Sequence, residues 1–218
     1  MLVLFSHATS LQQPAGIWPR RRWLGSVVME FQEVVQRRHM VRTFTSQPVP
    51  PEVLDRILGN AVRGPSAGFS QGQAFLVLTG EDLPKFWAVA GEAIDPSAQT
   101  APLVIVPMSC KRVYLDRYAE PDKGWTDRDE SRWPVPFWHI DTGMAAMLML
   151  LTVVDEDLGA VYFGIIPPAV PKFRDAFGVP DDHEPIGAIA VGYDAEPKVR
   201  DLRSRRRPLE QMVHYGRW

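Results

Sequence analysis

The sequence predicts a single α+β domain, in which a sheet of short buried strands packs against helices. Three apolar runs, at 74–79, 103–109 and 186–193, have the length and composition of buried strands. Segments with apolar residues at helical spacing lie between and around these runs. No internal repeat or linker divides the 218 residues, and 45% of them are hydrophobic, which is enough for one full core.

The helices follow from apolar spacing and from start and stop residues. One helix is predicted over 29–38, and a second starts at Pro50-Pro51 and stops before Gly64-Pro65. Apolar spacing predicts two more, over 83–93 and 168–177. Residues 140–154 are apolar on almost all sides, which predicts a central buried helix. Between the second strand and this helix, residues 111–136 are predicted to form a long irregular excursion.

The N-terminal residues 1–28 are interpreted as an extension, and residues 29–218 as the domain. The extension lies either upstream of the real start of the protein or forms an arm that packs on the body. Its arginines follow a short apolar start, whereas a secretory signal places basic residues first. We find no run of the roughly 18 apolar residues that span a bilayer. A cytoplasmic protein without a membrane segment is therefore expected.

Composition argues against several kinds of site. The net charge of −2 gives no reason to expect binding to nucleic acid or membranes. Cys110 is the only cysteine, which excludes an intramolecular disulfide and a multi-cysteine metal site, and it is expected to be buried packing. The five histidines show no metal-ligand spacing, so no metal site is predicted.

The string RHMVRTF, residues 38–44, is a basic cluster with no acidic residue from 36 to 47. It follows a predicted helix C-terminus, where an anion needs cations from side chains. Arg38 and Arg42 supply the planar, permanently charged donors that suit phosphate. The alternative is a solvated basic patch, which this stretch alone favours.

Three further stretches are candidates for a ligand site. RGPSAGFSQGQAF, residues 63–75, joins a helix to a strand by a loop whose backbone is open to a flat ligand, with a plain turn as the alternative. DLGAVYFGIIPPAV, residues 157–170, brackets an aromatic run with Gly159 and Gly164. SRRRPLE, residues 204–210, is a second source of cations.

In their order and spacing these stretches resemble the FMN-dependent nitroreductase family, from about residue 29 to 218. The strings that carry the resemblance are RHMVRTF, GPSAGFSQ, WHIDTGMAAMLML, DLGAVYFG, AIAVGY and RRRPLEQMVH. The resemblance implies a nitroreductase-like mixed β-sheet flanked by helices. It also implies an intertwined homodimer with one FMN at each end of the dimer interface, where the helix at 140–154 would lie in the core or at the interface.

The resemblance also implies a cofactor site. Arg38 would face the phosphate, and Arg42 the phosphate, the ribityl chain or the pyrimidine edge of the flavin. The loop at 65–67 would run along the flavin, and the segment 163–165 would bring a main-chain N–H to flavin N5. The implied cofactor-binding positions are Arg38, His39, Met40, Arg42, Pro65, Ser66, Ala67, Phe69, Gln71, Phe163, Gly164, Ile165, Arg206 and, as second choice to it, Arg205.

Some positions depart from the family pattern. Met40 stands where serine is usual, Phe69 replaces a frequent asparagine, Gly72-Gln73 replaces a proline followed by an aromatic residue, and Ser204 replaces a frequent lysine. The aromatic residues of the excursion, Tyr114, Tyr118, Trp125 and Trp133, are expected to pack in the core, with a lid over a flat substrate as the alternative.

The implied function is an FMN-dependent oxidoreductase that passes hydride from NAD(P)H to a nitroaromatic, quinone or similar flat acceptor by a ping-pong mechanism. The cofactor carries the reaction, so no side chain is predicted to be catalytic. Three alternatives stay open. They are the flavin-cleaving branch that forms a benzimidazole, a flavin-binding storage or sensor protein without turnover, and a phosphate- or nucleotide-binding module unrelated to flavin.

Overall fold

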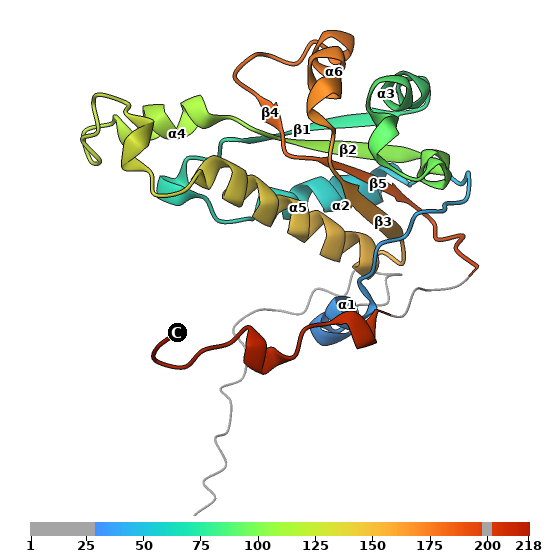
Figure 1. Cartoon of the computed structure of the whole chain (residues 1–218). Coiled ribbons are helices and arrows are strands. Elements are labelled where there is room, and N and C mark those ends of the chain that lie inside the picture. Colours follow the sequence, from blue (N-terminus) through green and yellow to red (C-terminus); the bar gives the residue numbers. More distant parts are fainter. Residues whose placement is uncertain (1–28, 198–201) are drawn as a thin grey trace, which may run out of the picture.

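A computed structural model describes residues 29–197 and 202–218, so the interpretation of residues 1–28 lies outside the described residues. Its centre is one antiparallel sheet (Figure 1). The strand order is β1 (Gln73–Thr79), β2 (Leu103–Ser109), β5 (Ala188–Gly192) and β3 (Gly159–Phe163), and the short β4 (Glu184–Pro185) pairs with the end of β2. A mixed sheet is wrong for these strands, because parallel pairing among the described residues is confined to one bridge, between Met40 and Ala160.

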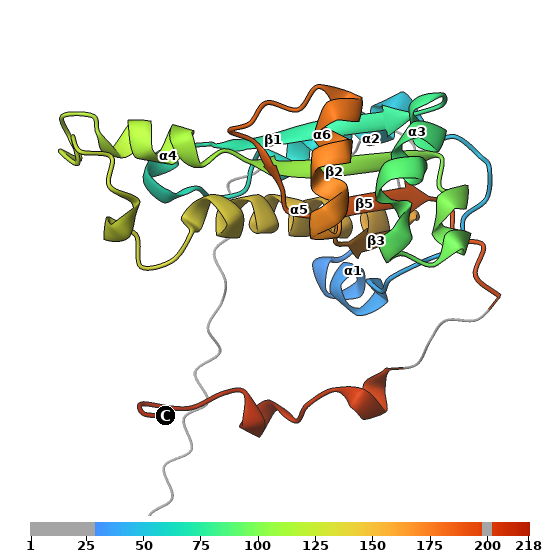
Figure 2. The same cartoon turned by 45° about the horizontal axis from the view of Figure 1, so that its top comes forward.

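Helices cover both faces of the sheet (Figures 1 and 2). The helices α2 (Pro51–Ala61) and α5 (Phe137–Asp155) lie on one face, and α3 (Asp82–Ala90) and α6 (Val170–Phe177) lie on the other. The apolar strand β2 is buried on both sides, as its composition predicts. Its side chains alternate between the two faces of the sheet and pack in two cores. Val104 packs with Phe86 and Phe173 on one face, and Ile105 packs with Met149 on the other.

The long helix α5 is the central buried helix that the sequence predicts. Most of its surface packs on α2 and the sheet, but Ile140, Met144 and Met147 are exposed along one stripe. Among the described residues it is the one helix long and apolar enough to cross a membrane, so the expectation that no segment meets that test is wrong. However, 56% of its most apolar window is buried inside the protein, as in the core helix of a globular domain.

Two parts of the chain differ from the sequence prediction. The segment DLGAVYFG forms strand β3, which the pattern does not reveal because glycines at both ends interrupt the apolar run. The excursion at 111–136 begins with a regular helix, α4 (Lys111–Tyr118), instead of irregular chain. Its polar residues hide the helical period, since Tyr114 is the only buried residue of this helix.

The two ends of the described chain flank the body. Helix α1 (Phe31–Arg37) precedes RHMVRTF and packs against α5. The tail at 202–218 runs beside the body rather than into it, as Figure 2 shows. Its apolar side chains are exposed, including Leu209, Met212, Tyr215 and Trp218.

Candidate functional site

The basic string RHMVRTF runs from the end of α1 along the edge strand β3. Met40 forms a parallel bridge with Ala160, and the Val41 N–H donates to the Ala160 carbonyl at 2.9 Å. Gly159 permits this close approach, because a Cβ at that position would lie 2.7–2.9 Å from three carbon atoms of Val41. Val41 is fully buried, so the segment is fixed to the sheet by packing as well as by hydrogen bonds.

The three arginines around the end of α1 have different partners. Arg37 is ion-paired with Asp157 at 2.8 Å. Within the described residues, neither Arg38 nor Arg42 has a carboxylate within ion-pair distance of its guanidinium. The Arg42 guanidinium donates to the Met40 carbonyl at 3.3 Å, and the Arg42 main-chain N–H donates to a carboxylate oxygen of Glu196 at 2.5 Å. Arg38 and Arg42 are both partly buried. Two partly buried guanidinium groups without an ion-pair partner among the described residues form a site suited to an anion.

His39 and Met40 have contacts within the protein. The His39 ring is held by a hydrogen bond of 2.8 Å between Nδ1 and the Arg37 carbonyl. The sulfur of Met40 accepts the Tyr162 N–H at 3.5 Å. Met40 therefore ties the basic string to the chain immediately before residues 163–165.

The segment 163–165 follows β3 and offers free main-chain donors. Phe163 is buried and stacks on Trp87, with ring centroids 5.9 Å apart. Gly164 is exposed, and a Cβ on it would meet no atom within 4 Å. No acceptor in the described residues takes the N–H of Gly164 or Ile165. Met40 thus places the basic string beside β3, the strand that leads into residues 163–165.

The loop at 65–72 forms a separate group. Its backbone takes the left-handed conformation at Gly68 (φ 62°), Phe69 (φ 56°) and Gln71 (φ 56°). This conformation is costly for residues other than glycine and is often found at functional sites. Phe69 is 76% exposed, so its ring is available to a ligand or a partner. The Ser66 hydroxyl accepts the Gln71 N–H at 3.0 Å, which closes the loop on itself.

Asp141 and Arg117, which the sequence pattern does not single out, hold this loop together with Tyr114. The buried carboxylate of Asp141, in α5, accepts the Ala67 N–H at 2.8 Å and the Tyr114 hydroxyl at 2.9 Å, both on Oδ2. Arg117 donates to the Gly68 carbonyl at 3.0 Å. Burial, together with the bond to Asp141, raises the pKa of Tyr114, so its hydroxyl stays a donor. The signal for Asp141 was present in the sequence as a single acid in the apolar string WHIDTGMAAMLML.

The aromatic residues of the excursion pack against one another beside this loop. Tyr114 is fully buried and Trp133 is 9% exposed, and both belong to a cluster with Trp138. Tyr118 and Trp125 lie against this cluster, with ring centroids 4.9 Å apart. Their geometry is that of core packing rather than of an open lid.

The loop and the basic string lie at opposite ends of α5. The loop is bonded to Asp141 near the start of the helix, and Arg37 is bonded to Asp157 just beyond its end. A rise of about 1.5 Å per residue puts about 21 Å between Asp141 and Asp155. The predicted tail cations, Arg205 and Arg206, are exposed in the segment that runs beside the body. One chain therefore assembles only part of the implied site.

The comparison with known proteins identifies the family. The model of the nitroreductase family matches residues 35–193. The chain belongs to the nitroreductase family. A Methanothermobacter thermautotrophicus protein, provisionally named NADH dehydrogenase/NAD(P)H nitroreductase, is 28% identical over 87% of this chain and 88% of its own. An NADPH-dependent oxidoreductase of Staphylococcus aureus is 22% identical over 85% of this chain and 72% of its own.

A solved structure shows the same fold. The FMN-dependent nitroreductase of Clostridium difficile has a TM-score of 0.66 and 21% identity, over 85% of this chain and 98% of that one. The fold and family implied by the sequence strings are confirmed.

Proposed function

We propose that the protein is an FMN-dependent oxidoreductase that passes hydride from NAD(P)H to a nitroaromatic, quinone or similar flat acceptor by a ping-pong mechanism. Family membership and the oxidoreductase names of its relatives support an NAD(P)H enzyme that uses FMN. The observation that carries the proposal for this chain is the position of the basic string on β3. Its two arginines lack an ion-pair partner among the described residues, and β3 leads to the open amides at 164–165. Its single cysteine supports a place in the reducing cytoplasm.

The residues present fit FMN. A phosphate needs cations, and the guanidinium groups of Arg38 and Arg42 have no ion-pair partner among the described side chains. The edge of a flavin ring needs main-chain donors, and the N–H groups of Gly164 and Ile165 have no acceptor in the described chain. A Cβ added to Gly164 would have no neighbour within 4 Å, so a flavin ring has room to lie against the backbone there.

The protein would bind and orient the reactants, while FMN, when bound, supplies the hydride chemistry. Arg38 would hold the phosphate. Arg42, partly buried beside Met40, would place positive charge where the flavin gains electrons. The Gly164 N–H would fix the ring by its reactive edge, and Phe163, stacked on Trp87, would keep that segment rigid.

We propose a homodimer in which each site takes residues from both chains. Two observations support it: the loop at 65–72 lies about 21 Å from the basic string along α5, and an apolar stripe on α5 is exposed. Packing two copies along this stripe would bury Met144 and Met147 and bring the loop of one chain to the arginines of the other. Phe69 and the tail arginines would complete the site across the interface.

The anion assignment is tested by FMN affinity. Arg38→Ala removes the proposed phosphate partner and is expected to weaken binding by at least about tenfold, since one charged hydrogen bond contributes about 1.5–3 kcal/mol. The matched control is Arg37→Ala, which removes a neighbouring arginine whose partner is Asp157, and it should leave the affinity within about twofold. Combining Arg38→Ala with Arg206→Ala should weaken binding further. Unchanged affinity in the double variant would remove both residues from the site.

The composite site is tested by the state of association. Met144→Glu places a charge on the apolar stripe and is expected to give a monomer with little bound FMN, because an unpaired charge in an apolar interface is costly. Lys172→Glu, on exposed α6 across the sheet, is the control and should remain dimeric. Light scattering and flavin content measure the two results. A Met144→Glu monomer that binds FMN normally would contradict a site shared between chains.

A further inference from the structure

The pairing of β4 with β2 brings three metal-binding residue types together at one end of the sheet. Ser109, the last residue of β2, pairs with Glu184 of β4, so the turn before β4 lies beside the residue that follows β2. That residue is Cys110, and the turn carries Asp182 and His183. One ligand atom from each of the three lies within 4.8 Å of the others. This cluster is separate from the basic string and from residues 163–165.

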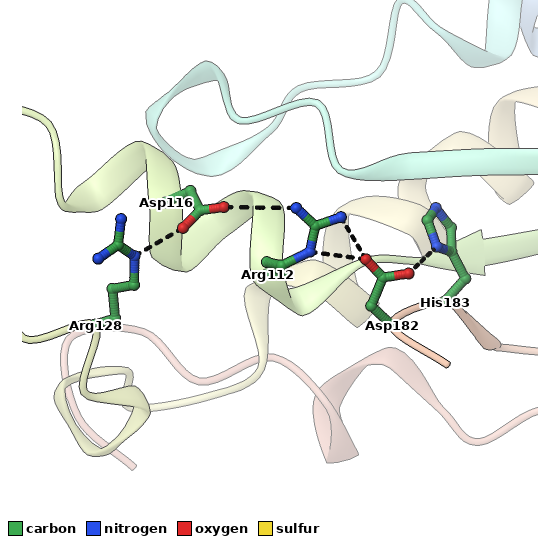
Figure 3. A network of polar contacts seen from close by, with 5 residues as sticks. All are labelled: Arg112, Asp116, Arg128, Asp182 and His183. Carbon is green, nitrogen blue, oxygen red and sulfur yellow. Dashed lines mark hydrogen bonds and ion pairs between the residues drawn. The ribbon is translucent and has the colours of Figure 1, made fainter. Parts of the chain in front are cut away.

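The carboxylate of Asp182 is already oriented by its neighbours (Figure 3). Arg112 donates through Nε and Nη2 to Oδ2 of Asp182, at 2.8 and 2.5 Å. The other oxygen, Oδ1, lies 2.7 Å from Nδ1 of His183. Arg112 is held in turn by Asp116, at 3.8 Å. The Arg112 guanidinium thus binds Oδ2 of Asp182 and leaves Oδ1 facing His183. Residues behind a metal ligand commonly orient its carboxylate in this way.

We propose that Cys110, Asp182 and His183 bind a zinc-class transition metal ion, with solvent in the fourth position. Thiolate, imidazole and carboxylate are the ligands that zinc takes in proteins, and three protein ligands with one open position are typical of accessible sites. Zinc bonds of about 2.0–2.3 Å place tetrahedral ligand atoms about 3.5 Å apart. Because the ligand atoms of the three residues now lie within 4.8 Å of one another, movements of about 1 Å would bring them to these distances around an ion. The Cys110 thiol is buried, whereas the side chains of Asp182 and His183 are 29% and 26% exposed, so an ion can reach the site from solvent.

The bound ion would act on the loop at 65–72 through α4. Cys110 is the N-cap residue of α4, and its N–H donates to the Gly72 carbonyl at 2.8 Å. The same helix carries Tyr114 and Arg117, which hold the loop. An ion that joins the turn before β4 to Cys110 would fix the start of α4 and, through α4, the loop at 65–72. It would also stabilise the folded state by mass action. The sequence prediction of no metal site depended on local spacing, whereas these ligands come from distant parts of the chain.

The experiment uses the full-length protein after treatment with a chelator, followed by titration with Co²⁺ and then Zn²⁺. We expect one Co²⁺ per chain, a sulfur-to-cobalt charge-transfer band in the near ultraviolet, loss of the band when Zn²⁺ is added, and a higher melting temperature with Zn²⁺. Cys110→Ser and His183→Ala should each abolish the band. His214→Ala, in the exposed tail, is the matched control and should keep it.

If Cys110→Ser fails to fold, variants of the two partly exposed ligands, Asp182 and His183, still test the proposal. Asp182→Asn and His183→Ala alter side chains at the surface, and circular dichroism verifies their fold. A folded wild-type protein that takes up no Co²⁺, or binds it without the sulfur band, overturns the proposal. So does a band that persists in His183→Ala. Because none of these readouts uses flavin or NAD(P)H, failure here leaves the proposed oxidoreductase function untouched.

Discussion

Gly159→Ala tests how the basic string is positioned. The added Cβ would lie 2.7–2.9 Å from three carbon atoms of Val41, whereas carbon atoms in contact are normally about 3.5–4.0 Å apart. The string must therefore move away from β3 by about 1 Å. That movement would lengthen the bond between the Val41 N–H and the Ala160 carbonyl from 2.9 Å to beyond hydrogen-bond range.

The expected cost follows from these two effects. Overpacking a buried contact costs about 1–3 kcal/mol, and the lost hydrogen bond about 0.5–1.5 kcal/mol, so the free energy of unfolding should fall by about 1.5–4.5 kcal/mol. The same shift would displace Arg38 and Arg42, which flank Met40, from their positions beside β3. We therefore expect FMN to bind at least about tenfold more weakly, which corresponds to about 1.4 kcal/mol.

Urea denaturation and an FMN titration measure the two effects, and two variants serve as controls. Gly59→Ala, in α2, has no atom within 4 Å of the new Cβ and should be neutral or stabilising by up to about 1 kcal/mol. Adding Val41→Ala to Gly159→Ala removes two of the three close carbon atoms, so the double variant should lose less stability than the sum of the two single changes. Wild-type stability and affinity in Gly159→Ala would refute the close-approach reasoning.

Two predictions concern the loop at 65–72. Tyr114→Phe removes one of the two donors to the buried carboxylate of Asp141 and should lower the free energy of unfolding by about 1–3 kcal/mol, measured by urea denaturation; a change below about 0.5 kcal/mol would mean that this bond does not hold the loop. The Arg117 side chain holds the pKa of Asp122 below its ordinary value by hydrogen bonding. The stability from this pair is therefore complete above about pH 4 and is lost as the pH falls through the lowered pKa. Tryptophan fluorescence between pH 6 and pH 2 should report loosening near Trp125, and Asp122→Asn should flatten that profile; an identical acid profile in the variant would exclude this cause.

The sequence predicted those parts of the fold whose local pattern agrees with the tertiary environment. Strand β2 and helix α2 lie where the apolar runs and the start and stop residues place them, because burial repeats with the period of the element. Strand β3 was missed because glycine is needed at its start to admit Val41, and glycine weakens a strand pattern. Helix α4 was missed because it buries one residue only.

The candidate site could be predicted in part for a related reason. The strings RHMVRTF and DLGAVYFG are each short and distinctive, and the fold joins them through Met40 and Ala160. Asp141 is recognisable only as an acid out of place in an apolar helix, since its partners come from two distant segments. The cluster of Cys110, Asp182 and His183 has no local pattern, because the pairing of β2 with β4 creates it.

The absorbance spectrum of the purified protein, before and after addition of NADPH, tests the proposed function most directly. We predict a yellow protein with one FMN per chain, whose visible absorbance falls when NADPH or NADH is added and returns when a quinone or nitroaromatic acceptor follows. A colourless protein that takes up no added FMN would contradict the cofactor assignment. Bound flavin that stays oxidised in excess NADPH and NADH would contradict the reductase and leave a flavin-binding protein without turnover.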